Sequence, residues 1–267
     1  MIKVIVCGGC GKMGSKVAQL IYQNKDMGLI GIIESPSHPD IGKDWGMSLG
    51  LGKTGIIVRN SLEEIIPVTD QIVEFTNPQV SIQHLEIVSK YKKAMIMGTT
   101  GFSSEEIEKI NKLAQGIPFL LSPNMSLGVN LLFKLAAETA AALGDDYDIE
   151  IVEAHHRFKK DAPSGTAKKL AQQIAKAKGI NLDEVAIYGR EGIIGERKKG
   201  EIGIHSIRSG DITGEHTVMF TALGERLELT HKAHGRDTFA YGTMQAIKFM
   251  EGKSPSFYEM KDVLEIK

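Results

Sequence analysis

The chain has 267 residues, of which 42% are hydrophobic and 24% charged, as in an ordinary globular protein. Its formal net charge of -1 excludes the strong basic excess on which general nucleic-acid or membrane binding depends. No apolar run approaches the roughly 18 residues of a membrane span, and the N-terminal sequence MIKVIVCGG lacks the regions of a signal peptide. We therefore expect a cytoplasmic protein without a nucleic-acid or membrane partner.

The first predicted strand leads through a glycine-rich turn into a helix. Residues 4–21 read VIVCGGCGKMGSKVAQLI, in which Gly9, Gly11 and Gly14 form a G-x-G-x-x-G motif between the two elements. Glycines keep such a turn tight and let backbone amides at the helix N-terminus approach a pyrophosphate. The next predicted strand ends at Glu34, where a carboxylate can accept hydrogen bonds from an adenosine ribose. The segment therefore predicts dinucleotide binding.

The only two cysteines, Cys7 and Cys10, form a C-x-x-C pair within this segment. Two sulfurs without a second pair of ligands make a poor zinc site. Cys7 also continues the apolar run of the strand, so we interpret the pair as structural and predict no metal.

Strands and helices then alternate along the chain. Strands are predicted near residues 56–58, 71–75, 94–97 and 118–121, and helices over 78–92 and 104–115, the latter opened by a Ser103-x-x-Glu106 capping box. Such alternation predicts a doubly wound parallel sheet, in which ligands bind beyond the carboxyl ends of the strands. The candidate residues at those ends are Phe75, Thr76, Gly98, Thr99, Thr100, Gly101, Ser122, Pro123 and Asn124.

The pattern changes after Asn124. A helix over residues 128–143, a strand over 147–154 and a helix over 164–178 precede strands over 202–208, 216–223 and 226–232. Adjacent antiparallel strands do not continue a doubly wound unit, so a second, α+β domain is expected. Spacing leaves open whether the final helix, 238–250, and a short segment at 263–264 return to the first domain.

The segment from 152 to 170, VEAHHRFKKDAPSGTAKKL, concentrates positive charge before a predicted helix. Residues 155–160 carry two histidines, one arginine and two lysines, and Asp161 is the only acid of the loop. The free amides of residues 164–166 at the helix N-terminus favour an anion, which Lys159 could also contact. Either a carboxylate or a phosphate fits this site. The two histidines suit proton donation at neutral pH.

The segment EAHHRFKKDAPSGTA resembles the signature of the dihydrodipicolinate reductase family, also called 4-hydroxy-tetrahydrodipicolinate reductases. The resemblance continues through GGCGKMG, EFTNP, GTTGF, SPNMSLGVN and HKAHGRDTFAYG, and so runs nearly end to end. It implies reduction of a cyclic, unsaturated pyridine-type dicarboxylate by NADH or NADPH to tetrahydrodipicolinate, in lysine and diaminopimelate biosynthesis.

The resemblance also implies roles for individual residues. His155 and Lys159 would donate protons, although their position leaves open which is the ultimate donor. The substrate-binding residues would be His156, Lys159, Ser164, Gly165 and Thr166. The cofactor-binding residues, including those at the strand ends, would be Gly8, Gly9, Cys10, Gly11, Lys12, Met13, Glu34, Phe75, Thr76, Gly98, Thr99, Thr100, Ser122, Pro123, Asn124, Met125 and Arg236.

The implied fold is α/β, a Rossmann-type doubly wound parallel sheet with an inserted α+β domain. Residues 1–126 plus 237–267 would form the dinucleotide-binding domain, and 127–236 would bind substrate and assemble a homotetramer. In some members an arginine that meets the 2'-phosphate of NADPH follows the ribose-binding acid, whereas Ser35 and Pro36 follow Glu34 here. We therefore expect NADH to be used at least as well as NADPH.

Three alternatives remain at the level of sequence. A related reductase acting on an aspartate-derived semialdehyde would not require both carboxylates for turnover. A non-enzymatic redox sensor would bind NADH tightly, and no substrate would cause the NADH to be oxidised. A metallohydrolase using the histidine pair would need a third ligand and would lose activity to a chelator.

Overall fold

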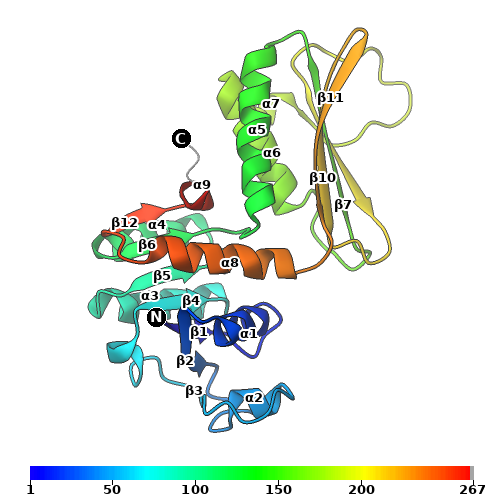
Figure 1. Cartoon of the computed structure of the whole chain (residues 1–267). Coiled ribbons are helices and arrows are strands. Elements are labelled where there is room, and N and C mark those ends of the chain that lie inside the picture. Colours follow the sequence, from blue (N-terminus) through cyan, green and yellow to red (C-terminus); the bar gives the residue numbers. More distant parts are fainter. Residues whose placement is uncertain (265–267) are drawn as a thin grey trace. The chain divides into compact units, whose positions relative to one another are not determined.

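The computed structural model describes residues 1–264, which form two compact units (Figure 1). Residues 1–126 and 237–264 make up the first, and residues 127–236 the second. Residues 265–267 of the expected dinucleotide-binding domain lie outside the described part. Among the described residues, no helix combines the length and apolar character needed to cross a membrane.

The first unit is a parallel sheet of seven strands in the order β12-β6-β5-β4-β1-β2-β3. The order changes direction between β1 and β4, which is where doubly wound sheets bind their ligands. The predicted fold class is therefore confirmed. The strands are β1 (Ile2–Cys7), β2 (Met27–Ile33), β3 (Val58–Arg59), β4 (Gln71–Glu74), β5 (Ala94–Met97), β6 (Pro118–Leu121) and β12 (Ser256–Tyr258).

Helices pack against this sheet because successive strand residues point to opposite faces. On one face Ile5, Ile72 and Met95 join the buried side chains of α3 and α4 in a single core, while α1 and α8 pack against each other. The expected capping box of α4 is present: the Ser103 side chain accepts a hydrogen bond from the Glu106 backbone amide, and the Glu106 side chain accepts one from the Ser103 backbone amide. The helices of this unit are α1 (Gly14–Gln23), α2 (Trp45–Ser48), α3 (Pro78–Lys90), α4 (Ser104–Leu113), α8 (Asp237–Met250) and α9 (Met260–Val263), with short 3-10 turns at Ile66–Val68 and Ala114–Gly116.

Three details differ from the sequence-based expectations. The strand predicted at residues 56–58 lies at Val58–Arg59, where it pairs with the end of β2. Helix α2 and strand β12 were not predicted, because each has only three or four residues and no periodic pattern. β12 extends the sheet by pairing with β6, so the C-terminal segment from α8 onward belongs to the first unit.

The second unit has a mixed sheet in the order β11-β10-β7-β9-β8, with α5 and α6 packed together. The apolar residues Ile149 and Ile151 of β7 share a core with Leu170 and Ile174 of α6. Its elements are α5 (Leu127–Leu143), β7 (Asp148–His155), α6 (Gly165–Lys178), α7 (Leu182–Val185), β8 (Ala186–Ile187), β9 (Ile202–Arg208), β10 (Gly214–Ala222) and β11 (Glu225–Ala233). β7 ends one residue later than predicted, so His155 is part of the strand and only His156 begins the loop.

Candidate active site

The glycine turn after β1 has no room for larger residues. Gly8 has a φ of +76°, and a Cβ there would lie 2.6 Å from the carbonyl oxygen of Phe75. A Cβ on Gly14 would lie 2.1 Å from the Gly8 oxygen. No side chain caps the N-terminus of α1, where the Ser15 amide donates to the Gly11 carbonyl oxygen at 3.0 Å, so an anionic ligand can contact the remaining amides of the first turn. These features fit the pyrophosphate of a dinucleotide.

Two side chains from other segments fix the shape of this turn. Glu34, at the end of β2, accepts a 2.8 Å hydrogen bond from the Cys10 amide through Oε1. Trp45 is fully buried, and its Nε1 donates a 3.1 Å bond to the carbonyl oxygen of Gly9. No sequence pattern pointed to Trp45, although it is the only tryptophan of the chain. The Cys10 thiol is half-buried, and burial together with the charges of Glu34 and Asp40 raises its pKa to about 12.

A buried carboxylate, Glu74, links the ends of β4 and β5. Its Oε1 accepts bonds from the amide and hydroxyl of Thr76, and its Oε2 lies 2.7 Å from Nδ1 of His84. The Ser81 hydroxyl lies 3.2 Å from Glu74 Oε1 and 2.8 Å from Thr99 Oγ1. The network therefore joins two predicted cofactor residues, Thr76 and Thr99. A charged residue within an apolar strand was the signal that could have revealed Glu74.

The other predicted cofactor residues lie at the same carboxyl edge, with one exception. The Phe75 ring packs against Gly98, and the Ser122 hydroxyl donates a 2.8 Å bond to the carbonyl oxygen of Asn124. Among the predicted cofactor residues of this edge, Met13 is partly and Met125 fully buried, and the exposed ones are Gly11, Lys12, Thr100 and Pro123. Arg236 is exposed and is the last residue of the second unit.

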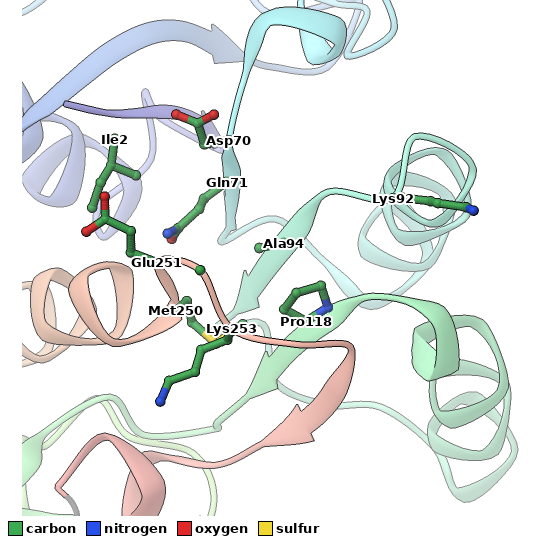
Figure 2. Close-up of a pocket in the computed structure, with 10 residues that line it drawn as sticks. Ile2, Asp70, Gln71, Lys92, Ala94, Pro118, Met250, Glu251 and Lys253 are labelled. Carbon is green, nitrogen blue, oxygen red and sulfur yellow. The ribbon is translucent and has the colours of Figure 1, made fainter.

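A pocket of about 400 Å³ lies at the opposite edge of the first unit's sheet (Figure 2). Gln71, Ala94 and Pro118, which line it, are the first residues of β4, β5 and β6. Since dinucleotides bind beyond the carboxyl ends of strands, this pocket is not where the predicted cofactor residues gather.

In the second unit, the core-facing side of β7 becomes polar at its carboxyl end. Glu153 and His155 follow Ile149 and Ile151 on the same face of the strand. Glu153 is fully buried and accepts bonds from both terminal nitrogens of Arg208, at 2.9 and 2.7 Å. It also accepts the amide of Ser164 at 3.0 Å. Burial alone would raise the pKa of Glu153, but hydrogen bonds from Arg208, His155 and Ser164 lower it to about 2.

This carboxylate orients His155. Nδ1 of His155 lies 2.5 Å from Glu153 Oε2, and because Glu153 is ionised, Nδ1 carries the proton of the neutral ring. Nε2 is then the atom that can exchange a proton with a ligand. Burial lowers the pKa of His155, the nearby charges of Lys159 and Arg208 lower it further, and Glu153 opposes both. The free site therefore holds a neutral His155 at neutral pH.

A third histidine, His216 of β10, was missed by sequence reasoning. Its ring stands edge-on to His155 with centroids 5.2 Å apart, and its Nε2 lies 3.2 Å from Ser164 Oγ. Burial lowers the pKa of His216 to about 3, and the neighbouring His155 contributes. His216 is thus neutral at physiological pH. Arg208 and His216 lie 55 and 63 residues after Glu153, so no local pattern could have placed them here.

The predicted substrate residues surround the N-terminus of α6. Ser164 is the N-cap and accepts the Ala167 amide, while Gly165 and Thr166 form the first turn. Lys159 pairs with Asp161 at 2.9 Å. The half-buried His156 has no hydrogen-bond partner at Nδ1 among the described residues. One cationic loop, one helix N-terminus and one polarised histidine therefore meet within this unit.

Glu153→Gln is expected to destabilise the fold in a pH-dependent manner. Because folding lowers the pKa of Glu153 from 4.5 to about 2, the wild type carries a contribution of about 3 kcal/mol above pH 4.5, which is lost as pH falls toward 2. The Glu153→Gln variant lacks this contribution, so the difference in unfolding free energy between wild type and variant should shrink as the pH is lowered. Urea unfolding at several pH values measures this, with the exposed Glu108→Gln as control, and parallel curves for wild type and Glu153→Gln would contradict it.

Comparison with known proteins decides the family. Residues 2–125 match the family model described as "Dihydrodipicolinate reductase, N-terminus", and residues 128–264 match "Dihydrodipicolinate reductase, C-terminus". The chain belongs to the dihydrodipicolinate reductase family. It is an oxidoreductase that uses NAD(P)H to reduce 4-hydroxy-tetrahydrodipicolinate in lysine biosynthesis. This confirms the resemblance, and the semialdehyde reductase, redox sensor and metallohydrolase alternatives are set aside.

Relatives of the family are similar over their whole length. The 4-hydroxy-tetrahydrodipicolinate reductase of Syntrophus aciditrophicus is 52% identical over 264 residues, covering 99% of this chain and 98% of that protein. That of Geotalea uraniireducens is 45% identical over 267 residues, covering 100% of both. Among solved structures, the dipicolinate-bound dihydrodipicolinate reductase of Paenisporosarcina sp. TG-14 aligns over 100% of both chains with a TM-score of 0.77 and 26% identity.

Proposed function

We propose that the first unit binds the cofactor at its glycine turn and strand ends, and that NADH serves at least as well as NADPH. The tight turn at Gly8 and Gly14 and the uncapped α1 fit a pyrophosphate. Glu34 already accepts a hydrogen bond from Cys10 at the edge of this turn, where a ribose diol would supply similar donors. Bound NAD(P)H supplies the hydride for the electron-poor ring carbon conjugated to the imine.

The charges near Glu34 support the use of NADH. Asp40 lies close to Cys10 and pairs with Lys43 at 3.0 Å, so it partly neutralises the nearest cation of that loop. Lys12 is exposed on the turn. A 2'-phosphate beside Glu34 would therefore meet its carboxylate, and the nearest arginine along the sheet, Arg59, already pairs with Glu64 at 3.0 Å.

We expect kcat/KM for NADH to equal or exceed that for NADPH, and a value for NADPH more than about tenfold higher, equivalent to about 1.4 kcal/mol, would contradict this. Steady-state assays measure this ratio. The substrate is generated by the synthase that precedes this reductase in lysine biosynthesis, and the loss of NADH and of NADPH is followed separately. Ser35→Arg should move it toward NADPH by adding a cation beside the ribose, whereas Ser37→Arg is the matched control. A larger NADPH preference in the wild type would show that Lys12 or Lys43 outweighs the missing arginine.

The second unit, in our proposal, holds a cyclic dicarboxylate between Lys159, His156 and the first amides of α6. Ser164 is held in place by Glu153 and His216, so the amides of Gly165 and Thr166 are presented by a rigid N-cap. Lys159 can exchange its exposed partner Asp161 for a substrate carboxylate. The Paenisporosarcina relative is described as dipicolinate-bound, which supports a dicarboxylate ligand here.

Pyridine-2,6-dicarboxylate is expected to inhibit competitively with the substrate, and pyridine-2-carboxylate much more weakly. Each lost charge-assisted hydrogen bond costs about 1.5 to 3 kcal/mol, so the inhibition constants should differ by roughly tenfold to a hundredfold. Inhibition constants for the two compounds, measured under the same assay, test this. Equal constants would contradict the dicarboxylate site.

Proton delivery is assigned to His155 and Lys159. Negative charge builds on the enamine side of the ring, where the Lys159 ammonium and the α6 amides stabilise it. Burial is the main cause of the lowered pKa of His155, and the cations Lys159 and Arg208 add to it. Two bound carboxylates would offset these cations and favour the protonated ring, which can donate its proton from Nε2. Glu153 and Arg208 act by holding the ring in this orientation.

A homotetramer assembled through the second unit stays a prediction for this chain. Leu223 is 104% and Leu227 44% exposed at the turn and start of β11, which is an edge strand of the sheet. Exposed apolar residues on an edge strand favour association with another copy.

A further inference from the structure

Three potential metal ligands from two separate segments lie beside the glycine turn. Cys10 belongs to the turn itself, whereas His38 and Asp40 follow β2 in the loop that leads to α2. A sulfur, an imidazole nitrogen and a carboxylate oxygen from these residues lie within 4.8 Å of one another, and all three residues are half-buried. Thiolate, imidazole and carboxylate are the three ligand types that Zn²⁺ binds in proteins.

Hydrogen bonds hold the three residues in this arrangement. Glu34 Oε1 accepts the Cys10 amide at 2.8 Å, which positions the cysteine against the end of β2. The Asp40 amide donates a 3.2 Å bond to His38 Nδ1, and the His38 amide donates to the carbonyl oxygen of Ser35 at 2.9 Å. The loop therefore folds back on itself and presents an imidazole and a carboxylate to the thiol.

Little has to change for a cation to enter. Ligand atoms around tetrahedral zinc lie roughly 3.5 Å apart, given metal–ligand distances of 2.0 to 2.3 Å, and the three ligand atoms here already lie within 4.8 Å of one another. Asp40 Oδ1 pairs with Lys43, but the lysine side chain is 59% exposed, and exposed ion pairs contribute little to stability. Displacing Lys43 from Asp40 therefore costs little.

We propose that Cys10, His38 and Asp40 form a binding site for Zn²⁺ or a similar divalent transition-metal ion. Three protein ligands leave a fourth tetrahedral position for water. Cys10 binds as the thiolate and releases its proton to solvent, with no change of oxidation state.

This site would regulate the enzyme through the cofactor. The consequence rests on the proposed function, in which Glu34 and the turn around Cys10 receive the adenosine ribose. An ion bound to Cys10 would occupy space next to that ribose, so Zn²⁺ should inhibit competitively with NADH.

The test measures metal binding directly on the purified full chain. Wild type, Cys10→Ser, His38→Gln and the exposed control His234→Gln are titrated with Zn²⁺ in competition with a chromophoric chelator, and with Co²⁺, whose thiolate complexes absorb in the near ultraviolet. We expect the Co²⁺–thiolate band in wild type and in the control but not in Cys10→Ser. Zn²⁺ affinity should be at least about tenfold weaker in His38→Gln, since even groups that support a ligand contribute 10- to 100-fold.

The absence of the thiolate band in wild type, or equal Zn²⁺ affinity in wild type, Cys10→Ser and His38→Gln, would overturn the proposal. If Cys10→Ser fails to fold, the His38→Gln titration and the wild-type band still decide it. Repeating the Zn²⁺ titration with saturating NADH tests the metal site and the proposed position of the ribose separately. Weaker Zn²⁺ binding in the presence of NADH supports both the metal site and the ribose position. Unchanged binding leaves the metal site in place and contradicts the position proposed for the ribose.

Discussion

Replacing His155 with glutamine is expected to lower kcat by a factor on the order of 10² to 10⁴, the usual loss when a general acid is removed. Glutamine keeps a hydrogen-bonding side chain next to Glu153 but cannot carry a proton to the ring. The KM for the substrate should change much less than kcat, because His155 acts in the transition state. Steady-state kinetics with saturating NADH measure both constants.

The pH profile distinguishes an acid from a residue that only positions its neighbours. In wild type, kcat should fall as pH rises through the pKa that His155 has in the complex, and this limb should disappear in His155→Gln. His205→Gln is the matched control, because His205 lies on the adjacent strand β9 but faces the opposite side and contacts Glu150 at 2.7 Å. A near-normal kcat in His155→Gln would remove His155 from the proton pathway.

Lys159→Ala is expected to lower kcat and raise the substrate KM together. The ammonium both pairs with a carboxylate and stabilises the developing negative charge, so its loss affects ground state and transition state. The carboxylate contact alone is worth about 1.5 to 3 kcal/mol, or a roughly tenfold to hundredfold rise in KM. Kinetics at varied substrate concentration resolve the two effects.

Lys160→Ala provides the control for charge. Lys160 follows Lys159 directly and is exposed. The Lys160→Ala substitution therefore removes the same charge from the loop but leaves the proposed contact of Lys159 in place. If the two alanine variants had the same KM, the loop would act only through its general positive potential. A KM effect confined to Lys159→Ala supports a direct contact.

Local patterns predicted those parts of the site that are close in sequence. The glycine turn, Glu34 and the N-cap at Ser164 each depend on residues within one or two neighbouring elements, and each lies where its pattern indicated. The strand ends at Thr76 and Thr99 could be predicted because parallel strands place their carboxyl ends at one edge.

Long-range contacts could not be predicted in this way. The pairing of β7 with β9 and β10 brings Arg208 and His216 to Glu153, and register between strands so far apart depends on tertiary packing rather than on local pattern. The same applies to Cys10, whose neighbours His38 and Asp40 lie about thirty residues later. A search for a second cysteine pair could not reveal this proximity.

The most direct test of the central claim is the affinity for NADH and the turnover of the double variant His155→Gln/Lys159→Ala. We propose that the segment between β7 and α6 delivers the proton and binds the dicarboxylate, whereas the cofactor binds at the glycine turn. Calorimetry should then give the wild-type dissociation constant for NADH, while the coupled assay shows no measurable reduction. Retained turnover, or loss of NADH binding in the double variant, would contradict the account.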